Sequence, residues 1–181
     1  MIQNENHDNI INERLLMHKN ILIINIGGTF NKYYDPIRGE LCIDNGAHAL
    51  EDLASKWKHS FKIVNIIGKD SIEMTSEDRL ELLATIHQSS YRKILIVHGT
   101  DTMDLTAAYL SDADLEKCII LTGSMVPYSI DPVEATANFA FAYGSLLNHK
   151  TNGVFIAMHG LIDTHDKLYK ERKEGRFKHR M

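Results

Sequence analysis

The feature that most constrains the fold is a series of five short, strongly apolar runs. They lie at residues 21–26, 61–67, 94–97, 117–121 and 153–158. Near-continuous apolar runs of this length are typical of strands buried on both faces of a sheet. Helical patterns separate them, so strand and helix alternate along the chain. This predicts an α/β fold with an open, mostly parallel sheet and flanking helices, flavodoxin-like or Rossmann-like, with right-handed crossovers.

The helices are expected to bury apolar stripes with helical spacing. The last helix has the clearest start, because Asp131 is a good N-cap, Pro132 suits the first helical position, and Glu134 follows the cap by three residues. Residues 30–46 show no clean period and predict a long loop of functional or mobile character. The expected stripes are Leu50, Leu53, Ala54 and Trp57; Leu80, Leu83, Ala84 and His87; Leu105, Ala108 and Tyr109; and Ala135, Phe139, Ala142 and Leu146.

The two ends of the chain differ from its middle. Residues 1–19 predict a loose extension with at most a short helix, and they show no pattern of a signal peptide. From residue 165 onward, seven Lys or Arg stand against three acids, whereas the whole chain has a net charge of −4. We expect this basic tail to be a solvated end, either irregular or helical. A nucleic-acid-binding arm is a weak alternative, because aromatic residues are few and acids interrupt the run.

Composition excludes several classes of function. The 181 residues fit one domain with an ordinary core, and the net charge of −4 gives no reason to expect a polyanionic partner over the whole surface. The two cysteines and ten histidines show no metal-ligand spacing, and no run is long enough to cross a membrane. Phosphate-loop and Gly-x-Ser-x-Gly motifs are absent from the sequence. We therefore expect a soluble cytoplasmic protein without a metal or cofactor.

Small polar residues follow four of the expected strands at their carboxyl ends. They are Thr29, Asp70 with Ser71, Thr100 with Asp101, and Thr122 with Ser124. In a parallel sheet these ends share one edge, so the groups can converge on a pocket for a small polar molecule. Helix capping is the competing interpretation, because the residues at positions 100–102 are all good N-caps.

Three motifs resemble, in order and spacing, those of the bacterial L-asparaginases. They are Gly-Gly-Thr at 27–29, His-Gly-Thr-Asp-Thr-Met at 98–103 and Gly-Ser-Met-Val-Pro at 123–127. Residues 70–78 also match the intracellular form of that family. The resemblance covers about residues 20–177 and implies the fold of the family's N-terminal domain, with the second asparaginase domain absent from this chain.

The resemblance implies a catalytic role for each residue that matches a motif. Thr29 would be the nucleophile that attacks a side-chain amide carbon. Thr100, Asp101 and a lysine would activate it or the hydrolytic water. Lys170 is the first choice for that lysine and Lys167 the second, from their distance to the last strand and to the following Gly and Phe.

The resemblance also implies the substrate contacts. Ser71 and Asp101 would hold the α-carboxylate and α-amino groups of the substrate. Tyr33 or Tyr34 would supply the loop tyrosine of the family, whose usual position falls near Cys42. The full substrate-binding set is then Asp70, Ser71, Thr100, Asp101 and Ser124.

Two departures from the family pattern bear on substrate recognition. Ile72 stands where Gln or Ser usually follows the substrate-binding Ser, which removes a polar contact. The second domain of the family holds a carboxylate that touches the substrate's amino group in a neighbouring subunit, so its absence affects recognition of that group.

The resulting hypothesis is an L-asparagine amidohydrolase that also accepts glutamine poorly and assembles as a homo-oligomer. The oligomer is expected because the helix at 131–147 is apolar around more than one face. Two alternatives stay open: an asparaginase-like subunit of a tRNA-dependent amidotransferase, and a non-catalytic amino-acid-binding protein. Nucleic acid and membrane are otherwise not expected as partners.

Overall fold

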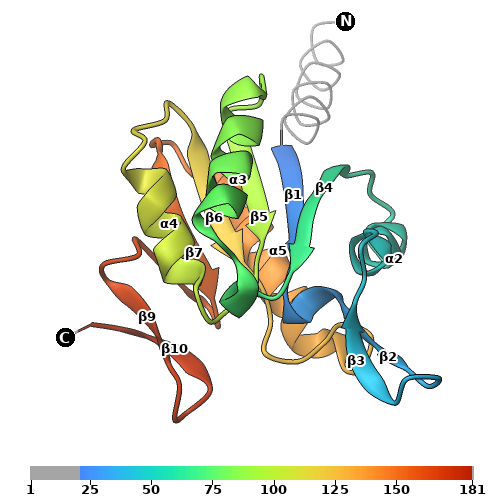
Figure 1. The fold of residues 1–181 in the computed structure, drawn as a ribbon. Helices are drawn as coiled ribbons and strands as arrows, with labels where there is room; N and C mark the ends of the chain where they lie inside the picture. Colours follow the sequence, from blue (N-terminus) through green and yellow to red (C-terminus); the bar gives the residue numbers. More distant parts are fainter. Residues whose placement is uncertain (1–20, 181) are drawn as a thin grey trace, which may run out of the picture.

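The computed structural model describes residues 21–180, so the expected extension at residues 1–19 lies outside the described part. A six-stranded sheet in the order β4-β1-β5-β6-β7-β8 forms its centre (Figure 1). The first five strands of that order are parallel and β8 pairs antiparallel to β7. The sheet strands are β1 (Ile21–Gly27), β4 (Lys62–Lys69), β5 (Lys93–Val97), β6 (Cys118–Thr122), β7 (Gly153–Met158) and β8 (Leu161–Asp163).

The order of the parallel strands is that of a flavodoxin-like sheet, because the second strand of the series lies outside the first and the third lies on the first strand's other side. This confirms the predicted α/β fold with an open, mostly parallel sheet. The point where the order reverses lies between β1 and β5, and at such a switch point open α/β sheets bind their ligands.

Helices cover both faces of the sheet (Figure 1). The β1 strand shows why, since Leu22 and Ile24 pack into the core under α3 and α4 while Ile21 and Ile23 pack into the core under α2 and α5. A strand with a near-continuous apolar run has a buried partner on each side. The helices are α2 (His48–Lys56), α3 (Ser76–Gln88), α4 (Met103–Ser111) and α5 (Pro132–Asn148).

The predicted apolar stripe of α3 was correct only for Leu83, which is partly buried against the core. The buried side chains of α3 are Asp78, Leu82 and Ile86, whereas Leu80 is exposed. The sequence of this helix contains two stripes with the same helical spacing, the one that was predicted and the one that is buried. A capping box between Thr75 and Asp78, together with hydrogen bonds from Lys69 to the Asp78 carboxylate, fixes the rotation of the helix.

The predicted stripe of α4 was correct only for Tyr109, which is partly buried against the core, whereas those of α2 and α5 were correct in their main residues. In α4, Met103, Ala107 and Leu110 are buried and Leu105 is exposed. In α5, the N-cap prediction holds, because Asp131 accepts a hydrogen bond from the Val133 N–H.

Glu134 does not close a capping box at the start of α5. Its carboxylate instead accepts from the backbone N–H groups of Met125 and Val126 and pairs with His159. The side chain that suits a cap by spacing therefore holds the loop after β6, a contact that only the tertiary fold creates.

The expected long loop at residues 30–46 was wrong. After a 3-10 turn, η1 (Thr29–Asn31), these residues form an antiparallel hairpin of β2 (Lys32–Asp35) and β3 (Glu40–Ile43). Its side chains are mostly exposed or half-buried, so the sequence lacks the apolar alternation by which a strand is recognised.

The prediction of an irregular or helical tail was wrong, although its basic side chains are exposed or half-buried, as expected of a solvated end. Residues 168–179 form a second hairpin, β9 (Leu168–Glu171) paired with β10 (Arg176–His179). Leu168 and Phe177 bury their side chains in the core. Both hairpins lie at the edge of the sheet where the parallel strands end (Figure 1).

Candidate functional site

The ends of β1 and β5 touch through their glycines. Gly28 has φ 78°, and a Cβ there would lie 2.4 Å from the Gly99 nitrogen. A Cβ on Gly99 would in turn lie 2.7 Å from the Ser71 side chain. Only glycine permits this approach. The residues directly after these glycines, Thr29 and Thr100, therefore start from one small region of the sheet edge.

Lys170 enters this region from the β9 strand. Its Nζ donates to Thr100 Oγ1 at 2.8 Å and to Asp101 Oδ1 at 2.9 Å. The Lys170 side chain is 16% exposed. Thr100 is buried and directs its own hydroxyl toward Met125 Sδ at 3.4 Å. Lys167 lies outside this cluster of Lys170, Thr100 and Asp101, because it pairs with Asp163.

Asp101 has a second cationic partner that the sequence did not reveal. Arg172 donates from one guanidinium nitrogen to Asp101 Oδ1 at 2.9 Å and from the other to the Asp101 carbonyl at 3.0 Å. Arg172 follows Lys170 by two residues and lies just past the end of β9, so the sequence signal is a pair of basic residues at the start of the hairpin turn. That signal becomes readable only when the tail is recognised as a hairpin.

Ser71 lies against the same segment. Its Oγ accepts a hydrogen bond from the Asp101 N–H at 3.1 Å, and its carbonyl accepts from Thr102 Oγ1 at 2.7 Å. Thr102 occupies the N-cap position of α4 but makes no side-chain capping bond. The hydroxyl and carboxyl groups at 100–102 thus bind Lys170, Arg172 and the Ser71 segment, and the capping interpretation does not account for them.

Thr29 begins the η1 turn and is half-buried. Its hydroxyl has no hydrogen-bond partner among the residues that the structure describes. The Gly28 N–H donates to the Lys69 carbonyl at 2.9 Å, which ties this turn to the end of β4.

Two of the predicted substrate residues are engaged elsewhere. Asp70 pairs with Lys32 of the first hairpin at 2.5 Å, and this pairing, with backbone N–H groups, holds the pKa of Asp70 below its usual value against the opposing effect of burial. Ser124 is fully buried and donates to the Val126 carbonyl at 2.6 Å, which shapes the loop after β6.

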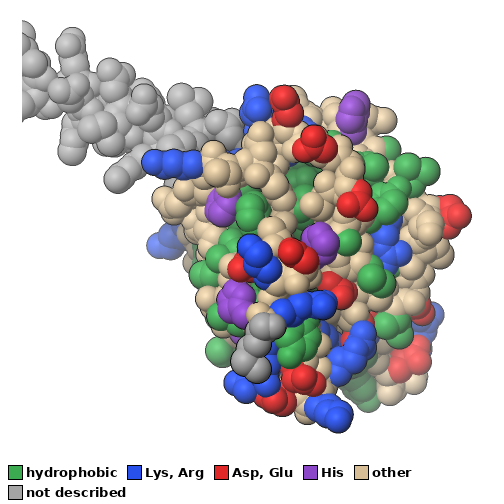
Figure 2. Space-filling view, turned by 90° about the vertical axis from the view of Figure 1, so that its left-hand side faces the viewer, with side chains coloured by type: hydrophobic (Ala, Val, Ile, Leu, Met, Phe, Trp, Pro, Cys, Tyr) green, Lys and Arg blue, Asp and Glu red, His purple; other side chains and the backbone are tan. Residues whose placement is uncertain are grey.

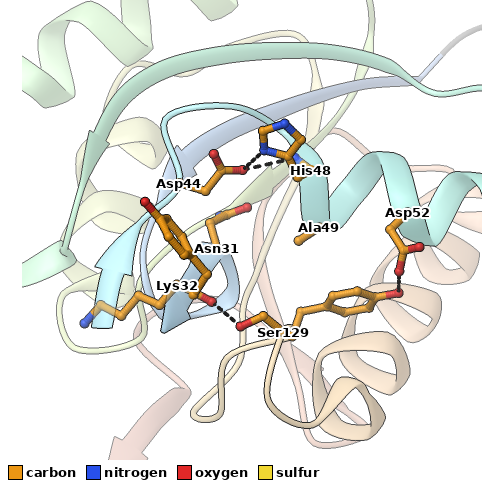
Figure 3. Close-up of a pocket in the computed structure, with 9 residues that line it drawn as sticks. Asn31, Lys32, Asp44, His48, Ala49, Asp52 and Ser129 are labelled. Atoms are coloured by element: carbon orange, nitrogen blue, oxygen red, sulfur yellow. Dashed lines mark hydrogen bonds and ion pairs between the residues drawn. The ribbon is translucent and has the colours of Figure 1, made fainter. Parts of the chain in front are cut away.

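The tyrosine candidates lie on the β2 strand, both largely exposed. Tyr33 borders a cavity of about 470 Å³ between the first hairpin and the α2 helix (Figure 3). This cavity is lined by Asn31, Lys32, Tyr33, Asp44, His48, Ala49, Asp52, Tyr128 and Ser129. It contains none of the residues of the Lys170 cluster, so it is a neighbouring hollow and not the space above Thr100.

The buried His98 supports the segment that follows β5. His98 is fully buried, and its Nδ1 donates to the Gly99 carbonyl at 2.6 Å while its Nε2 accepts from Thr106 Oγ1 at 2.8 Å. Arg79 donates to the same Thr106 oxygen. Burial lowers the pKa of His98 to about 4, with the nearby Arg79 charge adding to the effect. The neutral ring therefore acts as a fixed support for the segment that carries Thr100.

Within residues 21–180, no group of three or more His, Cys, Asp or Glu side chains is arranged to hold a metal ion. Over the same part of the chain, no helix is both long and apolar enough to cross a membrane. The cluster of Thr100, Asp101, Lys170 and Arg172 offers a hydroxyl, a carboxylate and two cations.

The model of the N-terminal asparaginase domain matches residues 20–176. The chain belongs to the asparaginase family. Among its curated relatives, a glutamyl-tRNA(Gln) amidotransferase subunit of Methanococcus vannielii is 31% identical over 80% of this chain and 35% of its own length. L-asparaginase 1 of Escherichia coli K12 is 31% identical over 59% of this chain and 32% of its own length.

Solved asparaginase structures share the fold. L-asparaginase I of Vibrio cholerae is 26% identical, with a TM-score of 0.75 over 88% of this chain and 50% of that one. The L-asparaginase of Thermococcus kodakarensis is 23% identical, with a TM-score of 0.76 over the same shares. The chain spans about a third of the length of these curated relatives and half of these solved asparaginases.

Proposed function

We propose that this chain hydrolyses the side-chain amide of L-asparagine to L-aspartate and ammonia, with Thr29 as the nucleophile. The observation that carries the proposal is the contact of Lys170 with Thr100 and Asp101 at the point where Gly28 meets Gly99. Membership of the asparaginase family supports the class of reaction. Glutamine would be a poorer substrate.

The reaction divides into two displacements. Thr29 Oγ forms a bond to the amide carbon, the carbon–nitrogen bond breaks, and ammonia leaves with the proton that the Thr29 hydroxyl gives up. Water then attacks the ester, which frees aspartate and restores the hydroxyl. Thr100 and Lys170 would relay the proton in each step, and backbone N–H groups at the Gly-rich strand ends would stabilise the oxyanion.

Ser71 and Asp101 would hold the backbone groups of asparagine. The two residues adjoin in the structure, because Ser71 Oγ accepts a hydrogen bond from the Asp101 backbone N–H. Asp70 would act indirectly in this scheme through its pairing with Lys32. Tyr33 or Tyr34 would reach the nucleophile only if the first hairpin folded over the edge of the sheet.

The test is ammonia release from L-asparagine by the purified chain, by Thr29→Ala and by Thr100→Val. We expect Thr29→Ala to lower kcat by about 10⁴-fold and Thr100→Val by about 10³-fold, as for other residues that act as a catalytic unit. Thr85→Ala, a matched change on the surface of α3, should leave the rate unchanged. A rate that survives Thr29→Ala removes the assignment of the nucleophile.

A second candidate function is that of an asparaginase-like subunit in a tRNA-dependent amidotransferase. The similarity to the Methanococcus amidotransferase protein over 80% of this chain favours it. Such a subunit would work with a partner chain and would use the basic side chains of the second hairpin.

The two functions separate in the purified protein. The amidotransferase role predicts that tRNA is retained at low salt and released as salt rises, because phosphate contacts release counterions. It also predicts weak ammonia release without a partner. Full turnover of asparagine by the isolated chain, with no retained tRNA, supports the free amidohydrolase.

The third possibility, an amino-acid-binding protein without turnover, is decided by the same ammonia measurement. We further propose that the protein acts in the cytoplasm without a cofactor. A Campylobacter jejuni protein of this fold is described as a probable cytoplasmic L-asparaginase.

A further inference from the structure

The Asp101 carboxylate is held by two cations through one oxygen. Both Lys170 Nζ and an Arg172 nitrogen lie 2.9 Å from Oδ1. The second Arg172 nitrogen binds the Asp101 carbonyl, so the planar guanidinium is fixed to the backbone as well as to the side chain. The negative charge of Asp101 is therefore more than balanced before any substrate arrives.

Two other lysines have carboxylate partners of their own. Lys32 pairs with Asp70 and Lys69 pairs with Asp78, so these two cations are neutralised. Arg79 has only hydroxyl and backbone oxygens as partners among the described residues, and one of those hydroxyls is that of Thr102.

Two cations, Lys170 and Arg172, thus contact the single carboxylate of Asp101 in a chain whose net charge is −4. Figure 2 shows the face formed by α4 and the β9–β10 hairpin, on which Lys and Arg side chains gather in the lower half with acidic side chains among them.

This charge distribution has opposite effects on the two ionic groups of an amino acid. An ammonium beside Asp101 meets the repulsion of Arg172 and Lys170, whereas a carboxylate beside the same cations is attracted. Ile72, next to Ser71, is 70% exposed and offers no acceptor to an ammonium. The charges at this edge of the sheet therefore favour a substrate carboxylate over a substrate ammonium.

We infer that Arg172 is a specificity-determining residue that makes the site select the substrate's carboxylate and tolerate the absence or acylation of its α-amino group. The inference rests on the proposed function and widens its substrate class to compounds that lack a free α-amino group. Short monocarboxylates with a terminal carboxamide, such as N-acylated asparagine and succinamate, would be accepted as well as free asparagine.

The test compares L-asparagine with succinamate, which keeps the carboxylate and the carboxamide but lacks the amino group. The readout is the ratio of the two kcat/KM values, succinamate over asparagine. Arg172→Gln should lower this ratio about tenfold, equivalent to about 1.4 kcal/mol. Arg172→Lys keeps the charge and should hold the ratio near that of the wild type. Arg176→Gln is the matched control, because Arg176 pairs with Glu174 away from the cluster.

A ratio that does not move in Arg172→Gln overturns the inference, as does a wild-type preference for asparagine of about a hundredfold or more. Calorimetric binding of both compounds to Thr29→Ala, with and without Arg172→Gln, measures the same preference without turnover. If neither compound releases ammonia, the proposed function fails, and the binding ratio alone decides the role of Arg172.

Discussion

Single side chains at the sheet edge differ sharply in what they can do. Lys170 is largely enclosed and contacts a hydroxyl and a carboxylate, whereas Lys167 projects into solvent beside Asp163. An enclosed charge loses more when its partners change than an exposed one, because water screens the exposed pair. The two lysines were close alternatives in sequence and are far from equivalent in the fold.

Replacement of these lysines should separate them. We expect Lys170→Met to lower ammonia release by about 10²-fold to 10⁴-fold, because Thr100 loses its proton-transfer partner. Lys167→Met should leave turnover close to that of the wild type. Steady-state kinetics on asparagine measures both, and equal losses in the two variants would contradict the assignment of Lys170.

The buried His98 should make stability depend on pH. Its pKa is about 4 in the folded chain against 6.5 for the free side chain. Between pH 4 and pH 6.5, His98 binds a proton in the unfolded chain but not in the folded chain. The stability that the neutral His98 contributes is therefore complete above pH 6.5 and is lost as pH falls toward 4. The full loss of stability is about 3 kcal/mol.

Chemical denaturation across this pH range should show a shallower dependence of stability on pH for His98→Gln than for the wild type. His87→Gln, on an exposed helix position, should keep the wild-type slope.

At the scale of elements, the second hairpin is what delivers the cations. Lys170 and Phe177 are opposite each other in the β9–β10 register, with the Phe177 ring in the core and Lys170 directed to the cluster. Leu168 anchors the other end of the hairpin. Packing of two apolar side chains therefore positions Lys170 and Arg172, which are far from the cluster in sequence.

Removal of one anchor should affect stability and activity together. Phe177→Ala deletes a buried aromatic ring and should cost about 3 kcal/mol of unfolding free energy. Turnover should fall with it, because the hairpin no longer holds Lys170 in place. Phe177→Leu should recover most of both. Thermal unfolding and ammonia release are the two measurements, and full turnover in a destabilised Phe177→Ala protein would contradict the positioning role.

The contact between strand ends should be equally sensitive. Gly28→Ala adds a Cβ at positive φ that lies 2.4 Å from the Gly99 nitrogen, so the backbone must move. We expect a loss of about 3 kcal/mol or more in unfolding free energy. Gly144→Ala is the control, because nothing lies within 4 Å of its added Cβ in the α5 helix, and it should stabilise by about 0.5–1 kcal/mol. Equal stabilities for the two variants would contradict this account.

At the scale of the molecule, the apolar surface that α5 leaves exposed is smaller than the sequence indicated. The apolar residues around α5 are largely used inside the chain, where Phe139, Ala142 and Leu146 are buried and Phe141 packs against the same core. What stays exposed is a smaller group near the start of that helix. Ile130 is 57% exposed and Val133 is 72% exposed.

A homo-oligomer remains a prediction that solution mass can check. We expect size-exclusion chromatography with light scattering at micromolar concentration to give at least twice the 20.6 kDa of one chain. Val133→Glu should shift the mass toward the monomer, because a carboxylate would be buried in the contact. A wild-type mass of one chain would contradict the prediction.

The sequence predicted the five parallel strands, their order of appearance and the polar residues at their ends, because near-continuous apolar runs are typical of strands inside a parallel sheet. It also predicted the Asp131 cap, which depends only on neighbours in the chain. It failed for the faces of α3 and α4, where two stripes with the same spacing compete and only the contacts with the sheet choose between them.

The strand-end motifs were therefore legible from the sequence, since each is a local pattern of apolar residues, glycines and small polar side chains. The tertiary structure decided which of those polar groups meet. Lys170 and Arg172 reach Asp101 only because the chain folds back as a hairpin, and Asp70 and Ser124 turn to other partners. Contacts between residues some seventy positions apart depend on the packing of the whole chain, which no local pattern encodes.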